Sequence, residues 1–107
     1  MTTFDDRERA FEAKFARDEE MLFRVTARRN RLVGVWAAGL MGLTPEETDA
    51  YAKSVVQAEF EEAGDEDVVR KLLGDLIGAG VDVDEARVRT ALGDALVEAR
   101  RQLLEIP

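Results

Sequence analysis

The chain has 107 residues, with 23 acidic against 15 basic side chains and a net charge of -8 at neutral pH. This length fits one domain, and the acid excess argues against a nucleic-acid-binding protein, because phosphate contacts need clustered positive charge. The absence of Cys and His excludes disulfides, thiolate nucleophiles and histidine-based catalysis. The charged start and the shortness of the apolar run 32–43 predict a cytoplasmic protein without a signal peptide or membrane insertion.

The first predicted helix is too long for the rest of the chain. Nothing interrupts a helix over 5–42 until Gly34, and such a helix would measure about 57 Å, against about 24 Å for 46–61 and about 32 Å for 85–105. Only 21–42 can therefore be covered by a bundle. That part carries the apolar residues Leu22, Val25, Leu32, Val33, Trp36 and Leu40. We expect 1–20 to form an overhanging arm and 21–107 to form the bundle.

The arm has a narrow apolar stripe of its own. Phe4, Phe11 and Phe15 follow one another at spacings of seven and four, and Leu22 continues the series. Because a short isolated helix is marginal in water, we expect an arm that is frayed when free and helical when bound to a partner. The alternative is an arm that folds back, so that its Phe side chains fill the core.

Residues typical of helix starts and ends divide the remaining chain into three segments. Thr44, Pro45 and Glu47 have the spacing of a capping box with Pro at the first helical position. Gly64 and Asp65 predict a helix end followed by an N-cap, and the run 78–80 predicts another break. The next cap is Asp82 or Asp84. The fold class is therefore all-α, a four-helix bundle with helices near 21–42, 46–62, 66–77 and 84–104, in which Trp36 should be largely buried.

One basic cluster stands out in this acidic chain. Arg24, Arg28 and Arg31 lie on one helix face, in a segment, 21–45, that has no acidic residue. The face could be an anion site for phosphate or for a partner's carboxylates, or it could pair with the acidic second helix. The acidic runs 65–67 and 82–84 lack the spacing of a calcium loop and are expected to cap helices, not to bind metal. Nothing in the chain resembles an active site or a nucleotide-binding loop, so we expect no enzyme.

Three stretches carry a resemblance to a known family. They are TTFDDRERAFEAKFARDEE at 2–20, ARRNRLVGVWAAGLMGL at 27–43 and GDEDVVRKL at 64–72. In order and spacing the chain resembles the zeta subunit of alphaproteobacterial F-type ATP synthases. The resemblance implies inhibition of ATP hydrolysis through an N-terminal arm that enters a catalytic alpha/beta interface near the central stalk, with the gamma subunit close by. It also implies a four-helix bundle that binds ADP or ATP as a regulatory ligand, with no other cofactor.

The resemblance assigns the partner-binding positions to the arm. Contact with the alpha, beta and gamma subunits would come from Phe4, Phe11 and Phe15, and ionic pairing from Arg7, Arg9, Lys14 and Arg17. The nucleotide phosphates would meet the face of Arg24, Arg28 and Arg31, since they need fixed positive charge. The alternative function is a helical adaptor that binds another partner through the same arm.

Overall fold

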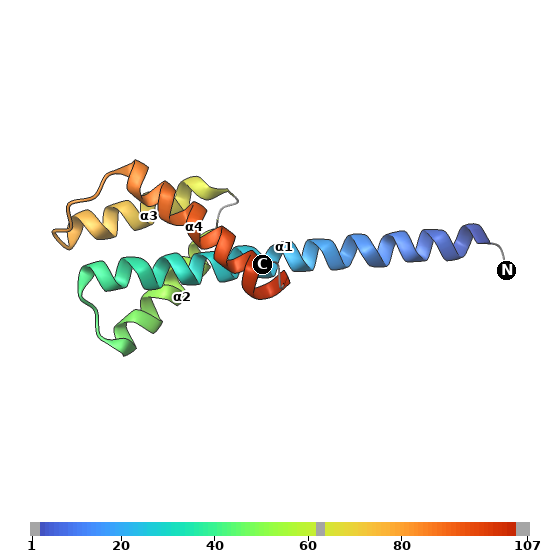
Figure 1. The fold of residues 1–107 in the computed structure, drawn as a ribbon, viewed down its shortest axis with the longest axis horizontal. Helices are drawn as coiled ribbons and strands as arrows, with labels where there is room; N and C mark the ends of the chain where they lie inside the picture. Colours follow the sequence, from blue (N-terminus) through green and yellow to red (C-terminus); the bar gives the residue numbers. More distant parts are fainter. Residues whose placement is uncertain (1–2, 62–63, 105–107) are drawn as a thin grey trace.

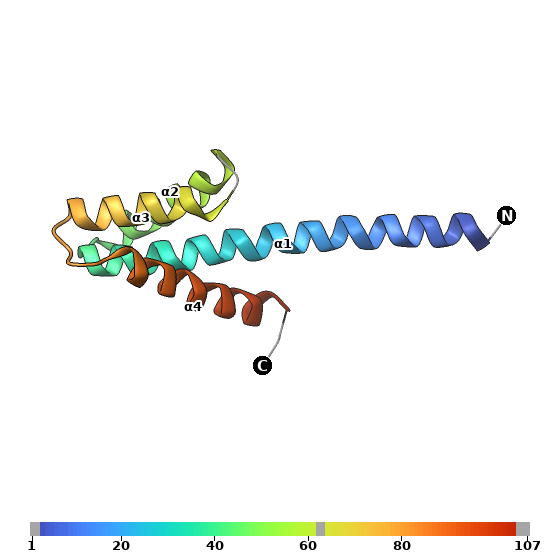
Figure 2. The same ribbon diagram turned by 90° about the horizontal axis from the view of Figure 1, so that it is seen from above.

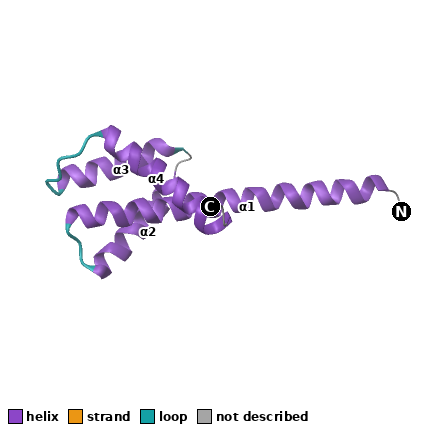
Figure 3. Ribbon diagram, in the orientation of Figure 1, coloured by secondary structure: helices purple, strands orange, loops and turns teal. Residues whose placement is uncertain are grey.

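The computed structural model describes the backbone of residues 3–61 and 64–104, and the side chains of 18–59 and 64–104. Four helices follow one another in these ranges: α1 (Thr3–Met41), α2 (Pro45–Glu61), α3 (Asp65–Gly78) and α4 (Glu85–Leu104). The described ranges contain no strand (Figure 3). The all-α prediction and its four segments are therefore confirmed, except that the first helix begins near the N-terminus and not at residue 21.

Helix α1 is the axis of the molecule. Helices α2 and α4 both pack against its C-terminal half, and α3 bridges α2 and α4 (Figures 1 and 2). Its N-terminal half continues past the ends of the other helices, and the molecule measures 65 × 29 × 26 Å as a result. The arm therefore projects instead of folding back. It extends a helix that the packed half has already nucleated, so each added residue has only the cost of propagation to meet.

The predicted capping residues and glycines form the turns between helices. The Thr44 N–H donates to Glu47 Oε1 at 2.9 Å and the Glu47 N–H donates to Thr44 Oγ1 at 3.2 Å, which is the predicted capping box. Gly42 ends α1 with a φ of 71°, where a side chain would be strained. Asp84, not Asp82, caps α4, because its Oδ1 accepts the Arg87 N–H at 2.8 Å.

One predicted cap is wrong. Asp65 is the first residue of α3 and not its N-cap, a position that Gly64 occupies without any side-chain hydrogen bond. The Asp65 carboxylate instead lies 3.0 Å from the Arg29 guanidinium.

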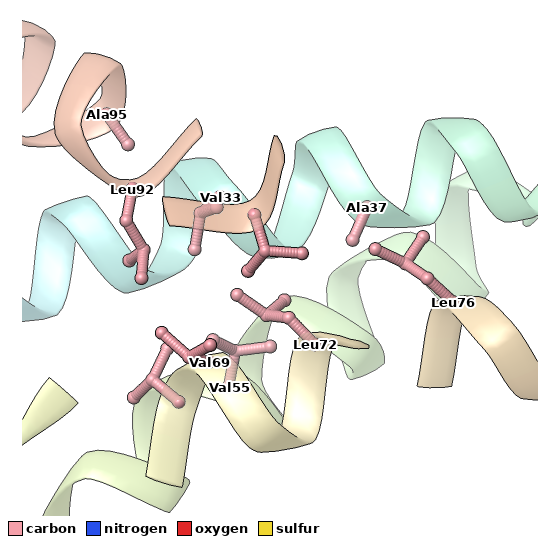
Figure 4. Close-up of a cluster of buried hydrophobic side chains, with 10 residues drawn as sticks. Val33, Ala37, Val55, Val69, Leu72, Leu76, Leu92 and Ala95 are labelled. Atoms are coloured by element: carbon pink, nitrogen blue, oxygen red, sulfur yellow. The ribbon is translucent and has the colours of Figure 1, made fainter. Parts of the chain in front are cut away.

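The core lies where all four helices meet. Fully buried aliphatic side chains from α3 interdigitate with those of the other helices (Figure 4). The cluster consists of Val33, Ala37, Val55, Val68, Val69, Leu72, Leu76, Val88, Leu92 and Ala95. It is small and mostly aliphatic, so the stability of the bundle depends on close packing of these few side chains.

Some expected core positions are solvent-exposed. Leu22, Leu40 and Ile77 are 65%, 41% and 57% exposed. Leu40 and Ile77 lie in the last turns of α1 and α3, and Leu22 lies in the middle of α1, near the start of its projecting part. Trp36, by contrast, is partly buried and packs against the core cluster, in agreement with its predicted place in the bundle. Its ring borders an open hollow between α1 and α4, where the Arg87 guanidinium lies 5.8 Å from the ring centroid.

Candidate functional site

The arm positions lie on the projecting part of α1. The backbone of Phe4, Arg7, Arg9, Phe11, Lys14, Phe15 and Arg17 belongs to this helix. Their side chains lie outside the described residues. A helix of 18 residues from position 3 to position 20 measures about 27 Å, which is long enough to reach well into a partner while the bundle stays outside.

The arginine face forms one side of a hollow. Arg24, Arg28 and Arg31 line a hollow of about 350 Å³ together with apolar residues from three helices. These are Phe23, Ala27, Val56 and Leu103. The sequence-predicted residues are thus brought together, on the open face of α1 between α2 and α4. Fixed cations beside an apolar wall are suited to an anion with an apolar body.

Each of the three arginines also has a partner within the chain. Arg24 Nη2 donates to Glu20 Oε1 at 2.8 Å, Arg28 Nη1 donates to Gln102 Oε1 at 3.0 Å, and Arg31 Nη2 donates to Asp49 Oδ1 at 3.0 Å. The Arg31 bond, with help from Lys53, holds the pKa of Asp49 below its ordinary value.

Among these three arginines and the side chains of 18–59 and 64–104, pairing with the acidic second helix is made by Arg31. The Arg24 pair is more than half exposed and the Arg31 pair nearly half exposed, and such pairs are worth little in water. An incoming anion could thus replace these carboxylates, or the Gln102 amide, at small cost.

The strongest electrostatic feature was not expected from the sequence. Arg29 is 7% exposed, and its guanidinium lies 3.0 Å from Asp65 Oδ1 and 3.6 Å from Glu59 Oε2. Its Nε also donates to Asn30 Oδ1 at 3.0 Å. Arg29 thus ties the end of α2 and the start of α3 to α1. A signal existed in the sequence: Asn30 is the only Asn of the chain, placed in a helix interior that Asn disfavours.

The acidic runs do not gather into a metal site. Asp84 caps α4 and Asp65 pairs with Arg29. Within 18–59 and 64–104, no three acidic side chains lie close enough together to hold a metal ion. In the same described part of the chain, no helix is both long and apolar enough to cross a lipid bilayer.

Comparison with known proteins places the chain in one family. The model of a family described as ATPase inhibitor subunit zeta matches residues 1–102. A protein solved by solution NMR is similar in fold, with a TM-score of 0.70 and 47% sequence identity over 79% of this chain and 96% of that one. No protein of curated function matches the sequence.

Proposed function

This chain belongs to the ATPase inhibitor subunit zeta family, an inhibitor subunit and not a catalytic enzyme, and from that premise we propose how it acts. It inhibits ATP hydrolysis by an F-type ATP synthase, to which it binds at the cytoplasmic side, peripheral to the membrane. Residues 1–20 act as the inhibitory arm and 21–107 as the bundle that carries it. The observation that supports this assignment is the projection of α1 beyond its three covering helices (Figure 1).

The proposed mechanism is steric. The arm enters a catalytic interface between alpha and beta subunits near the central stalk, and the helix must be expelled before rotation in the hydrolytic direction can continue. A helix needs a partner groove for its apolar stripe, and Phe4, Phe11 and Phe15 provide that stripe. Arg7, Arg9, Lys14 and Arg17 pair with carboxylates of the groove.

The burial of three aromatic side chains would provide enough binding free energy for such a contact. Burial of each Phe contributes roughly 2 kcal/mol of transfer free energy. Because interface energy concentrates in a few buried anchors, these three decide the affinity. Since the arm is already helical in the structure, little ordering entropy opposes its binding.

The direct test is ATP hydrolysis by the purified synthase with this protein added. The double variant Phe11→Ala/Phe15→Ala should lose almost all inhibition, whereas Glu12→Gln on the polar side should retain it. Equal inhibition by the two variants would mean that the Phe side chains of the arm do not contribute to inhibition.

The hollow beside Arg24, Arg28 and Arg31 supports a second activity, regulatory binding of ADP or ATP. The phosphates meet the guanidinium groups, and the apolar wall of Val56 and Leu103 accepts the base. Each charge-assisted contact is worth roughly 1.5–3 kcal/mol. In a titration with ADP, Arg28→Glu should bind more weakly than Arg100→Glu, whose side chain is exposed and does not line the hollow. Equal affinities would place the nucleotide elsewhere.

A helical adaptor for another protein is the competing function, since the same arm could serve it. Capture from cell extract separates the two, because the proposal requires alpha and beta subunits of the synthase among the captured proteins. Their absence, with a different partner bound through the arm, would favour the adaptor.

A further inference from the structure

The three arginines of the hollow on the open face of α1 differ in how their charges are balanced. Arg24 and Arg31 each pair with a carboxylate of the chain, which neutralises them locally. Arg28 Nη1 donates instead to the amide oxygen of Gln102, 3.0 Å away. An amide accepts a hydrogen bond but cancels no charge, and Arg28 forms no ion pair with the side chains of 18–59 and 64–104. Its positive charge is therefore uncompensated.

The Gln102 amide is held in place by its own helix. Its Nε2 donates to Glu98 Oε1 at 3.1 Å, one turn earlier on α4. The amide oxygen is thus the atom that remains to accept from Arg28. The Glu98 carboxylate is itself paired with the Arg101 guanidinium, so it does not balance the charge of Arg28 either. Gln102 therefore presents a fixed, neutral acceptor to Arg28.

We propose that Arg28 makes the main phosphate contact in this hollow and that Gln102, by competing with the phosphate for Arg28, sets the affinity of the site. The inference rests on the proposed binding of ADP or ATP at this face, to which it adds a residue of α4. Hydrogen bonds to a charged acceptor are roughly twice as strong as those to a neutral one. A phosphate therefore gains by replacing Gln102, whereas it gains less by replacing the carboxylates that hold Arg24 and Arg31.

The exchange is possible without opening the bundle. The side chains of Arg28 and Gln102 are both exposed, so a phosphate reaches them from solvent. Gln102 lies at the edge of the hollow, because the next residue, Leu103, forms part of its apolar wall. A guanidinium binds phosphate best through two parallel N–H groups. Once Gln102 has moved away, both are available on Arg28.

Titration of ADP into the full-length chain, followed by calorimetry, tests the role of Gln102. Gln102→Glu keeps the side-chain size but places a carboxylate against Arg28, so the Kd for ADP should rise by about fivefold. Gln102→Ala removes the competitor and should lower the Kd by about threefold. The matched control is Gln57→Glu, which adds the same charge at an exposed position of α2 that does not line the hollow. It should change the Kd by less than about twofold, since exposed charges at a distance are screened.

A second measurement ties the effect to Arg28. In the Arg28→Gln background the competition is gone, so Gln102→Glu should alter the Kd no more than Gln57→Glu does. Equal Kd values for Gln102→Glu and Gln57→Glu, in a chain whose wild type binds ADP, would overturn the role of Gln102 and leave nucleotide binding intact. No binding of ADP by the folded wild type would overturn the nucleotide site itself, and this inference with it.

Discussion

Helices α1 and α2 approach each other closely at Gly34, and this contact leads to a prediction about stability. A Cβ atom built at Gly34 would lie 2.9 Å from the Ala52 Cα and 3.3 Å from a methyl group of Val55. The first of these is a backbone atom, so it cannot rotate away and α1 and α2 must move apart. Gly34→Ala therefore separates the two helices that form the largest contact in the bundle.

The magnitude follows from two opposing effects. Replacing Gly by Ala inside a helix stabilises it by about 0.5–1 kcal/mol, whereas overpacking a tight contact costs typically 1–3 kcal/mol. We expect Gly34→Ala to lower the free energy of unfolding by roughly 1–2 kcal/mol. The control is Gly93→Ala in the middle of α4, where nothing lies within 4 Å of the added Cβ. It should raise stability by about 0.5–1 kcal/mol.

Urea unfolding followed by circular dichroism measures both variants. The midpoints should move in opposite directions from that of the wild type. If Gly34→Ala were as stabilising as Gly93→Ala, the close crossing of α1 and α2 would be wrong. Helix α1, from which the arm projects, would then not pack against α2 as closely as the structure shows.

Further predictions concern the ionic groups and caps. Arg29→Leu leaves the Glu59 carboxylate buried without its cation and should cost about 3 kcal/mol of stability, whereas Arg24→Leu, which breaks an exposed pair, should cost less than about 0.5 kcal/mol in the same unfolding assay. Thr44→Ala removes the capping box and should cost about 1 kcal/mol. Hydrogen bonds from Arg101, and then Gln102, lower the pKa of the Glu98 carboxyl from 4.5 to about 2. Because the pKa of Glu98 is lower in the folded than in the unfolded chain, the contribution of the ionised carboxylate to stability is present above pH 4.5 and is lost as the pH falls toward 2. An NMR titration of Glu98 should show the lowered midpoint. Loss of the guanidinium by Arg101→Ala should return that midpoint toward 4.5.

The helix boundaries could be predicted because their signals are local. The Thr44–Glu47 capping box and the Gly42 turn need only residues a few positions apart, and both are present as expected. The overhanging arm followed from length, since short helices cannot cover a long one. The role of Asp65 could not be predicted in this way, because its partner Arg29 lies far away in the sequence.

The candidate sites, too, could be predicted only where their signals are local in the sequence. The face of Arg24, Arg28 and Arg31 follows from helical spacing alone, and the structure brings these residues to one hollow. The apolar wall beside them depends on where α2 and α4 cross α1, which the spacing does not determine. The buried Asn30 is harder still, since its burial depends on how distant parts of the chain, among them α2 and Gly64, pack beside α1.

Removal of residues 1–20 separates the proposed inhibitory arm from the bundle that carries it. Within the described side chains, the buried hydrophobic residues begin at Val25, so the truncated chain should keep its helical circular dichroism and melt within a few degrees of the full chain. Added to the purified synthase, it should not slow ATP hydrolysis at concentrations at which the full chain inhibits completely. A folded, truncated chain that still inhibits fully would mean that the bundle, and not the arm, is the inhibitor.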